Sequence, residues 1–388
     1  MRTFSANDRR TRLARRHFLA VPATSIDTVV SDLVGLHATD PATPYLSLWA
    51  RLPGFTVAGL DAALYEERSV VKHLAMRRTL WVVDAGDLPQ VQAAVSDRVA
   101  DNERRKLIAD AQKAGLCTDG GQWLDTACRA VIEYLSEHGP TSARQLRAAL
   151  PELAGTYDPA PGKRWGGHTA LSPRVLTVLS VRGDIARGPN ELTWTASRPK
   201  WVATADWLSR DRDAASPDSA RAQLVSAYLR AFGPATVTDI KWWFGNTLTW
   251  ARHALRDIDA VEVDLAGTPG YALPDDLDDE TSPGPWGALL PALDPTTMGW
   301  FDRDWYLGGH RGQVFDRNGN AGPTAWWDGR VVGGWVQDAG GRVEVRLLED
   351  IGRQGRAALT RKAEALTEWL DGVRISPRFP SPLSRDAG

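Results

Sequence analysis

Cysteine and long apolar runs are nearly absent from this sequence. Cys117 and Cys128 are the only two cysteines in 388 residues, which excludes a disulfide framework or a cysteine-rich zinc site and is typical of a reducing cytosol. No apolar run approaches the roughly 18 residues that a membrane-spanning helix needs. We therefore expect a soluble protein with no membrane partner.

Familiar catalytic motifs are missing as well. The sequence contains no P-loop and no GxGxxG, GxSxG or HExxH pattern, which argues against nucleotide hydrolysis, dehydrogenation and zinc hydrolysis. Its seven histidines lack metal-ligand spacing, so we expect neither a metal nor a cofactor. With 46 Lys and Arg against 48 Asp and Glu, the protein must meet any polyanion with a local basic patch.

The sequence does have the composition of a globular protein, with 43% hydrophobic and 24% charged residues. Its length allows about two to three compact units. Apolar residues at spacings of three and four predict helices near residues 26–34 and 57–68, and β-branched residues predict a two-stranded ribbon over 70–74 and 79–83. Helices followed by a short hairpin are the order of a winged-helix unit.

An internal repeat predicts two further units of this kind. Residues 138–146 line up with residues 232–240. In both copies an apolar helix runs into Gly-Pro, and a Thr or Ser then caps a short helix, as in a helix-turn-helix. Each copy continues with another helix and a wing-like strand segment, so we expect a second and a third winged-helix module.

An acidic segment over 275–280, followed by Thr-Ser-Pro-Gly-Pro, marks a boundary between domains. Short alternating runs beyond it predict a small β-rich domain over 285–350, closed by a helix over 356–370 and a loose tail after Ile375. The runs are separated by three turn pairs, Asn318-Gly319, Asp328-Gly329 and Gly340-Gly341.

The predicted fold class is therefore α+β, with three tandem winged-helix modules and a small C-terminal β-rich domain. The first module would carry the candidate active site, and the last domain would end in a helix and the loose tail. The predicted domains cover residues 1–118, 119–213, 214–282 and 283–388.

Basic residues cluster at predicted wing and helix positions. Six arginines and one aspartate occupy residues 1–16, and residues 69–78 and 161–174 hold three basic residues each with no acid. Such a run is most often a solvated face, but cations interleaved with Trp and Gly also suit a phosphate backbone. The acidic segment 275–280 should then lie away from the DNA-binding surface. The candidate DNA contacts are Arg12, Arg15, Arg16, Arg51, Lys72, Arg77, Arg78, Lys163 and Arg164.

A short polar cluster follows the second predicted helix. His37 comes four residues after Leu33 and would continue the apolar stripe of that helix, where a histidine is more often a core residue than a catalyst. Thr39 and Asp40 lie beside it, just before Pro41, so the imidazole could instead hold or deprotonate a water. For Asp40, a turn hydrogen bond before the proline is the more frequent role, and electrostatic help to His37 is the alternative.

Three segments resemble those of a known family. They are GL-x-A-x-DP-x-x-PYL-x-LWAR from Gly35 to Arg51, MR-x-TLW from Met76 to Trp81, and LLPALDP from Leu289 to Pro295. In these segments the chain resembles the tandem winged-helix DNA glycosylases, of the AlkZ/YcaQ type, that remove bulky alkylated purines and unhook interstrand cross-links. The resemblance covers most of the chain. The family's catalytic motif, Gln-aliphatic-Gln or Gln-aliphatic-Asp, falls on His37 and Thr39, and both side chains depart from it.

The resemblance implies a concave, monomeric protein that binds damaged double-stranded DNA in the cytoplasm, at the nucleoid. It also implies hydrolysis, without a cofactor, of the N-glycosidic bond of alkylated or bulky-adducted purines, either in general repair or as resistance to an alkylating agent. In place of the glutamines, His37 would accept a hydrogen bond or proton from water and Thr39 another hydrogen bond. Protonation of His37 would end this role, so activity should fall in acid.

Two other functions remain open. The same scaffold could be a non-catalytic DNA-binding protein, either a regulator or a lesion binder that lost hydrolysis when the two motif side chains changed. It could also be a protein-interaction module, because winged helices bind proteins as well as DNA.

Overall fold

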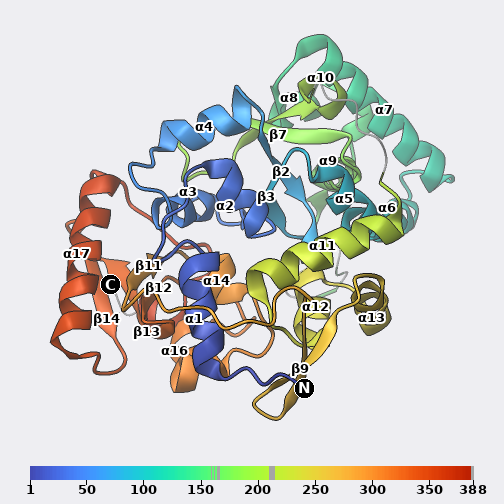
Figure 1. Ribbon diagram of the computed structural model, residues 1–388. Coiled ribbons are helices and arrows are strands. Elements are labelled where there is room, and N and C mark those ends of the chain that lie inside the picture. The colour runs from blue at the N-terminus through green and yellow to red at the C-terminus, as the bar shows by residue number, and fades with distance from the viewer. Residues whose placement is uncertain (159, 161, 164–166, 209–214, 386–388) are drawn as a thin grey trace.

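The computed structural model describes residues 1–158, 160, 162–163, 167–208 and 215–385 (Figure 1). The chain is α+β, as predicted. Its first 84 residues hold a small antiparallel sheet in the order β1-β3-β2, covered by helices. The elements of this part are α1 (Ala6–Arg16), α2 (Ile26–Asp32), β1 (Leu36–His37), α3 (Thr43–Trp49), α4 (Val57–Tyr65), β2 (Val70–Leu74), the 3-10 turn η1 (Met76–Arg78) and β3 (Leu80–Asp84).

Strands β2 and β3 are the predicted ribbon, but His37 lies in a strand and not on a helix. Helix α2 begins at its Ser25 cap and ends at Asp32. Val34 and Gly35 then adopt positive φ angles of 55° and 99°. A Cβ at Gly35 would lie 3.1 Å from the carbonyl oxygen of Val82, so glycine lets the chain turn sharply and pair with β3. The expected helical stripe through His37 was wrong because the helix stops five residues earlier.

The second and third modules repeat the order helix, short helix, helix and two-stranded wing, as the internal repeat predicts. A connecting segment precedes them, and the second sheet has the order β4-β8-β7, equivalent to β1-β3-β2. The connection is α5 (Leu88–Val91), the π-helical turn η2 (Gln92–Ser96) and α6 (Asp97–Lys113). The second module is α7 (Gly120–His138), β4 (Thr141–Ser142), α8 (Ala143–Ala149), η3 (Pro151–Leu153), β5 (Thr156–Tyr157), β6 (Thr169–Ala170), α9 (Ser172–Arg182), β7 (Ile185–Asn190), β8 (Pro199–Ala203) and α10 (Thr204–Trp207). The third is α11 (Pro217–Phe232), α12 (Val237–Phe244), α13 (Leu248–Asp257), β9 (Val261–Leu265) and β10 (Thr268–Ala272).

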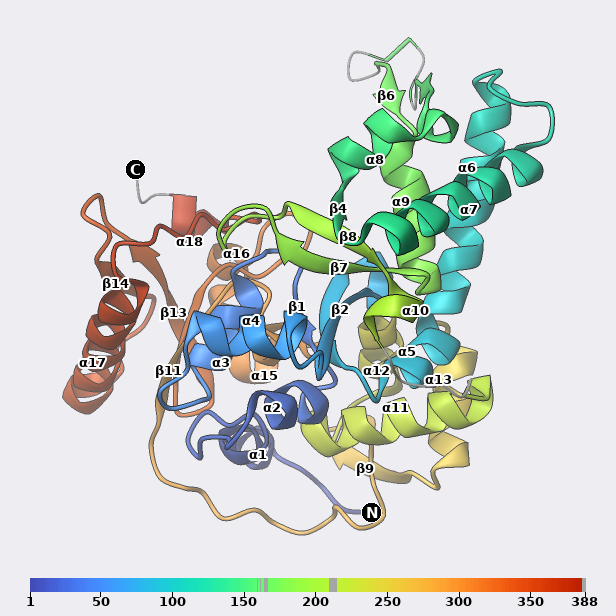
Figure 2. The same cartoon turned by 90° about the horizontal axis from the view of Figure 1, so that it is seen from above.

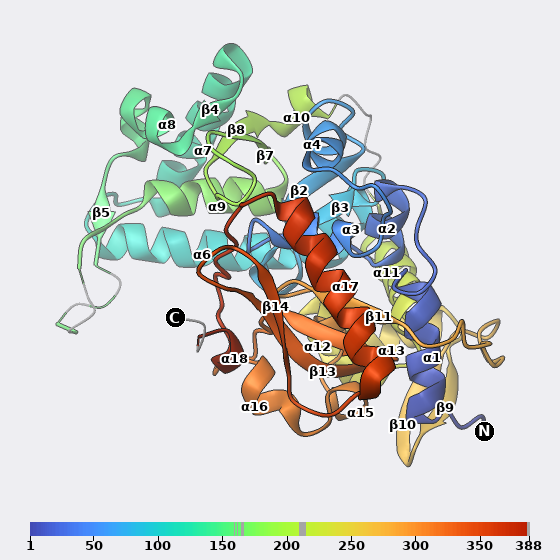
Figure 3. The same ribbon diagram turned by 90° about the vertical axis from the view of Figure 1, so that its left-hand side faces the viewer.

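The C-terminal domain is built on a four-stranded antiparallel meander, β11-β12-β13-β14. Asp328 and Gly329 both have positive φ and join β12 to β13, as the turn pair predicts. Helix α17 lies across this sheet (Figure 3). The elements are β11 (Gly287–Leu290), α14 (Pro295–Met298), α15 (Asp304–Leu307), η4 (Gly308–His310), α16 (Arg311–Val314), β12 (Thr324–Trp327), β13 (Arg330–Gln337), β14 (Val343–Leu347), α17 (Gly352–Leu370) and α18 (Pro382–Arg385).

One apolar core joins the first module, the third module and the C-terminal domain. Trp81, Trp243 and Trp326 are fully buried members of it. The second module has a separate core around Leu124 and Leu179. Figure 2 shows this module and the C-terminal domain on opposite sides of the first module. The predicted boundaries between the four domains stay predictions, and the one at 213/214 falls among residues that the structure does not describe.

The expectation of a loose tail after Ile375 was wrong. The backbone N–H of Arg378 donates to Asp40 Oδ2 over 2.8 Å, and Arg346 donates to the carbonyl oxygen of Leu383 over 3.0 Å. Ser381 and Leu383 are buried, and Phe379 packs against the shared core. Up to Arg385 the tail is therefore held in place beside the residues that follow β1. Arg378 and its partner Asp40 are 338 residues apart in the chain.

Candidate functional site

His37 lies in a row of side chains that crosses the first sheet. It pairs with Trp81 on β3, which pairs in turn with His73 on β2. Residues directly opposite one another in a sheet point to the same face, and the rings of His37 and Trp81 lie 4.9 Å apart. Trp81 also contacts Trp243 of α12 at 5.1 Å. The candidate histidine therefore faces the third module, and it is only 3% exposed.

The hydrogen bonds of His37 fix its neutral tautomer. Its Nδ1 accepts the backbone N–H of Thr39 over 3.3 Å, so in the neutral imidazole the proton sits on Nε2. Burial and the neighbouring positive charge of Arg77 lower the pKa of His37 to about 3. The side chain thus offers a donor from Nε2, where the sequence had suggested an acceptor. The expected loss of activity in acid is also revised, because His37 stays neutral well below pH 5.

Thr39 and Asp40 differ sharply in what they leave available. Thr39 is partly exposed, and its Oγ1 accepts the backbone N–H of Leu80 over 3.1 Å, so the hydroxyl proton can still be donated. Asp40 is buried, and its two oxygens accept the backbone N–H groups of Ala42 and Arg378. These contacts fit the turn role expected of Asp40, because its carboxylate already binds the backbone at the start of α3 and in the tail.

Arg77 connects this strand to the third module. Its φ of 54° turns the wing tip, and its guanidinium lies 4.0 Å from the centroid of Trp242. The guanidinium of Arg303 lies 4.6 Å from the same ring. Arg77 Nη1 and two nitrogens of Arg303 are buried without an acceptor among the described residues. Burial and the charge of Arg303 lower the pKa of Arg77 to about 9.

Arg51 was predicted to contact DNA, and the structure places it in the interior. Its side chain and that of Asp294 are fully buried and form two hydrogen bonds, Nη1 to Oδ2 at 2.9 Å and Nη2 to Oδ1 at 2.8 Å. Ser47 also donates to Asp294 Oδ2. Two of the three family-like segments, 35–51 and 289–295, therefore pack against each other, and Arg51 stabilises that contact.

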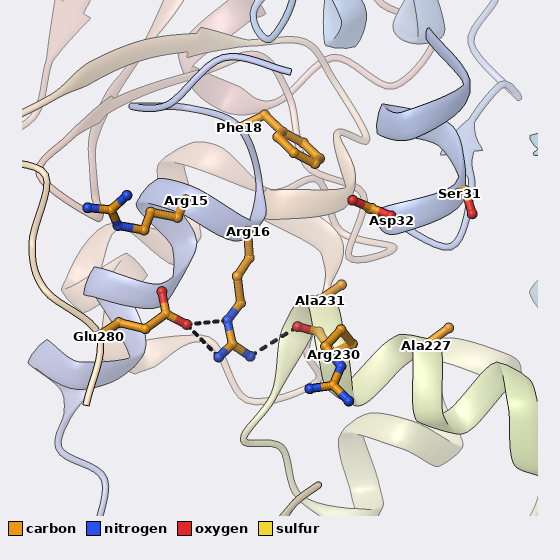
Figure 4. Close-up of a pocket in the computed structure, with 9 residues that line it drawn as sticks. All are labelled: Arg15, Arg16, Phe18, Ser31, Asp32, Ala227, Arg230, Ala231 and Glu280. Carbon is orange, nitrogen blue, oxygen red and sulfur yellow. Dashed lines mark hydrogen bonds and ion pairs between the residues drawn. The ribbon is translucent and has the colours of Figure 1, made fainter. Parts of the chain in front are cut away.

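We expected the acidic segment 275–280 to lie away from the DNA-binding surface. Instead it binds the basic N-terminal helix α1. Arg12 is 2% exposed and pairs with Asp276 over 2.8 Å. Arg16 pairs with Asp276 and Glu280. Figure 4 shows Arg16 directed at Glu280 and at the end of α11, in a pocket of about 490 Å³ that Arg15 and Phe18 also line. Arg12 and Arg16 are thus neutralised within the protein, whereas Arg15 remains exposed.

Lys72 is another predicted DNA contact that the structure buries. It pairs with Val82 on β3, which pairs in turn with Leu36 on β1, so Lys72 points to the face opposite His37. Its Nζ donates to the hydroxyl of Tyr65 over 3.0 Å. Burial lowers the pKa of Lys72 to about 8. The strand alternation and this hydrogen bond leave Lys72 unable to reach a surface phosphate.

The remaining predicted contacts are Arg78 and Lys163, which are exposed, and Arg164, which lies outside the described residues. Other exposed cations escaped the sequence analysis. Arg252 and Arg256 lie one turn apart on α13, the third helix of its module, beside a pocket of about 610 Å³. On α6, Arg98, Asn102 and Lys106 recur every four residues and face one pocket. That spacing places side chains on one helix face and was the signal that could have revealed both groups.

The described part of the chain contains no group of three or more His, Cys, Asp or Glu side chains placed to hold a metal ion. Within the same residues, no helix combines the length and the apolar character needed to cross a membrane.

Comparison with known proteins decides the family. The model of the family described as "DNA glycosylase AlkZ-like" matches residues 30–369. The chain belongs to the AlkZ-like DNA glycosylases. A curated relative from Streptomyces sahachiroi, named an interstrand DNA cross-link repair glycosylase, is 31% identical over 174 residues, which are 42% of this chain and 45% of that protein. The chain thus spans less than half of the length of this AlkZ-like relative.

A solved structure, the DNA glycosylase AlkZ of Streptomyces sahachiroi, shares the fold. The superposition has a TM-score of 0.73 and covers 96% of this chain and 98% of that one, at 21% identity. The AlkZ-like scaffold of winged-helix modules and C-terminal domain is therefore present over nearly the whole chain.

Proposed function

We propose that this protein is a DNA repair glycosylase that hydrolyses the N-glycosidic bond of purines carrying an alkyl group or a bulky adduct. The observation that carries the proposal is the placement of His37 and Thr39. By the family resemblance they fall on the two motif positions, and they lie at the end of β1 and just after it, with one N–H and one O–H group left to donate. Arg77 lies close enough to lower the pKa of His37, and a cation there suits a nearby phosphate.

The chemistry asked of these two residues is modest. Alkylation of a purine ring nitrogen gives the base a positive charge. When the bond between C1′ and the purine nitrogen breaks, its electron pair neutralises the base. A water oxygen then forms the new bond to C1′ and releases a proton to solvent. The protein has to orient the water and stabilise an oxocarbenium-like sugar, and neither task requires a strong acid or base.

His37 and Thr39 would orient the water as hydrogen-bond donors. The Nε2 proton of His37 or the hydroxyl of Thr39 donates to one lone pair of the water oxygen, which leaves another for attack on C1′. Asp40 acts as a positioning residue, because its carboxylate holds the backbone on both sides of this step. A glutamine side chain has both hydrogen-bond donors and an acceptor. With His37 and Thr39 in place of two glutamines, the site retains donors, and its acceptor atoms already receive backbone N–H groups.

The rate of base release should be independent of pH between 5 and 8 as far as His37 is concerned. Its pKa of about 3 keeps the imidazole neutral over this whole range. Single-turnover rates measured at constant ionic strength test the point. A decline with a midpoint near 6.5, the ordinary histidine value, would show that His37 titrates freely and would contradict the buried geometry.

The proposal itself is tested with duplex DNA that carries a single 7-methylguanine. Incubation with the protein should leave abasic sites that mild base converts to strand breaks, and undamaged duplex should stay intact. A duplex with a bulky N7 adduct and one with an interstrand cross-link would extend the test to the substrate in the name of the curated relative. No breaks on any of the three substrates would refute the proposal.

A non-catalytic lesion binder is the second candidate, and the burial of His37 favours it. With a side chain only 3% exposed, the motif offers little surface to a water or sugar unless DNA binding opens it. Tight, lesion-selective binding without base release would support this alternative.

We further propose that the protein acts as a monomer on double-stranded DNA at the nucleoid in the cytoplasm, with Arg15, Arg77, Arg78 and Lys163 among its DNA contacts.

A further inference from the structure

A pocket lined by basic side chains lies where the first module meets the third. The wing tip η1, helix α6 and the turn between α12 and α13 enclose a pocket of about 210 Å³. Four cations line it, two from the wing tip and two from α6. They are Arg77, Arg78, Arg98 and Lys106.

The pocket holds a single carboxylate, that of Glu103, among the residues described as lining it. Its side chain is 6% exposed and already shared, since Arg78 lies 3.0 Å away and Lys106 3.6 Å away. One acid cannot balance four cations, so the pocket carries an excess of positive charge. Arg77 Nη1 adds a buried donor without an acceptor in the described structure. Buried donors of this kind are costly to leave unsatisfied.

The neutral groups in the pocket point the same way. Arg98 Nη1 donates to the carbonyl oxygen of Gly245 and to Asn246 Oδ1, over 3.2 and 3.1 Å. Asn102 Oδ1 accepts a hydrogen bond from Arg105. Both amide oxygens are thus occupied, which leaves the two amide nitrogens as donors. A pocket lined by guanidinium, ammonium and amide N–H groups matches the oxygen atoms of a phosphate.

The architecture keeps this site small and close to the candidate motif. Gly245 has a φ of 63°, and a Cβ there would lie 3.0 Å from the backbone nitrogen of Arg77, so glycine lets the α12–α13 turn approach the wing tip. Arg77 forms one wall of the pocket and is also the charge that lowers the pKa of His37. Arg77 is therefore the residue that the pocket shares with the surroundings of His37.

We propose that this pocket binds a backbone phosphate of the DNA strand next to the lesion and so sets the distance between that strand and His37. The inference rests on the proposed DNA glycosylase function and deepens it, because it adds Arg98, Lys106, Asn102 and Asn246 to the DNA-binding residues. The pocket is a phosphodiester site, and its donors do not distinguish one base sequence from another.

The experiment uses the full chain with the double substitution Arg98→Ala and Lys106→Ala. Binding to an undamaged duplex is measured by fluorescence anisotropy at several salt concentrations, so the readout does not depend on catalysis. We expect about a 10-fold loss of affinity at low salt, and a slope of log K against log salt that falls in magnitude by about 1, as for one phosphate contact. The matched control is Lys113→Ala with Arg129→Ala, which removes two exposed cations outside the pocket.

Lys106→Glu gives a second variant that should fold normally, since the Lys106 side chain is 68% exposed. It changes the charge of the pocket by two units, as the double substitution does, and should weaken binding by a similar factor. Equal effects of the pocket and control variants on affinity and salt slope would overturn the proposal. Inorganic phosphate should compete with DNA for the wild-type protein more than for the pocket variant. If phosphate binds the pocket while the variant keeps wild-type DNA affinity, the site takes a free anion and the proposal is wrong. DNA held by this pocket without base release would refute the glycosylase function and leave the inference intact.

Discussion

Replacing Arg51 by methionine should lower the free energy of unfolding by about 3–5 kcal/mol, because it leaves a buried carboxylate without its partner. Asp294 and Arg51 are both fully buried, and the ion pair lowers the pKa of Asp294 against the opposing effect of burial. Urea unfolding followed by tryptophan fluorescence would measure the loss. The result matters for function, since this pair joins α3, which follows the candidate motif, to the C-terminal domain.

Two variants separate this effect from a general loss of packing. In the Arg51→Met, Asp294→Asn double variant the buried charge is gone while the side-chain shape is kept, so stability should recover in part. Arg356→Met removes an arginine from an ion pair with Asp350 that is largely exposed, and stability should not change measurably. If Arg51→Met were no more harmful than Arg356→Met, the buried ion pair would not hold the two segments together.

Stability should also fall steeply between pH 6.5 and 5, by about 1.4 kcal/mol per pH unit for each buried neutral histidine. His17 and His37 both have pKa values lowered to about 3, mainly by burial. In the unfolded chain these two histidines bind protons near pH 6.5, and in the folded protein they do not. Their full stability is therefore present above pH 6.5 and is lost as the pH falls towards 3. Urea midpoints at pH 7.5, 6.5, 5.75 and 5 measure the slope.

His37→Gln is the matched control for this pH dependence. The family resemblance implies a glutamine at this position, so we expect the strand to accept it, and glutamine does not titrate. The wild-type protein should lose stability about 1.4 kcal/mol per pH unit faster than the variant over the same interval. Identical slopes for the two proteins would mean that His37 is protonated in the folded state, and the neutral tautomer inferred from its contacts would be wrong.

Local patterns predicted most of the scaffold. The β2–β3 ribbon, the Asp328-Gly329 turn and the repeated helix order each depend on residues that are neighbours in the chain. Side-chain burial depends on distant partners, and here the sequence was less informative. Arg12 becomes buried because Asp276, 264 residues away, pairs with it. The tail is ordered because Asp40 accepts a backbone N–H from Arg378, 338 residues away.

The candidate site followed the same division. The motif positions of His37 and Thr39 came from the family resemblance. The donor character of His37 could not be foreseen, because it depends on a hydrogen bond formed after β1 turns away from α2. Lys72 was misplaced for a similar reason, since strand alternation only became decisive once the register with Val82 was known. The α6 stripe of Arg98, Asn102 and Lys106 was visible in the spacing and was overlooked.

The most direct measurement is the single-turnover rate of base release from a 7-methylguanine duplex by the wild-type protein, His37→Ala and Thr39→Ala, with DNA affinity measured in parallel. Losing one oriented hydrogen-bond donor to a developing transition state costs about 100- to 1,000-fold in rate. We expect a loss of that order for His37→Ala, with DNA affinity changed less than about threefold because the phosphate contacts remain. Unchanged base release by His37→Ala, or a loss explained entirely by weaker binding, would contradict a catalytic role for this motif.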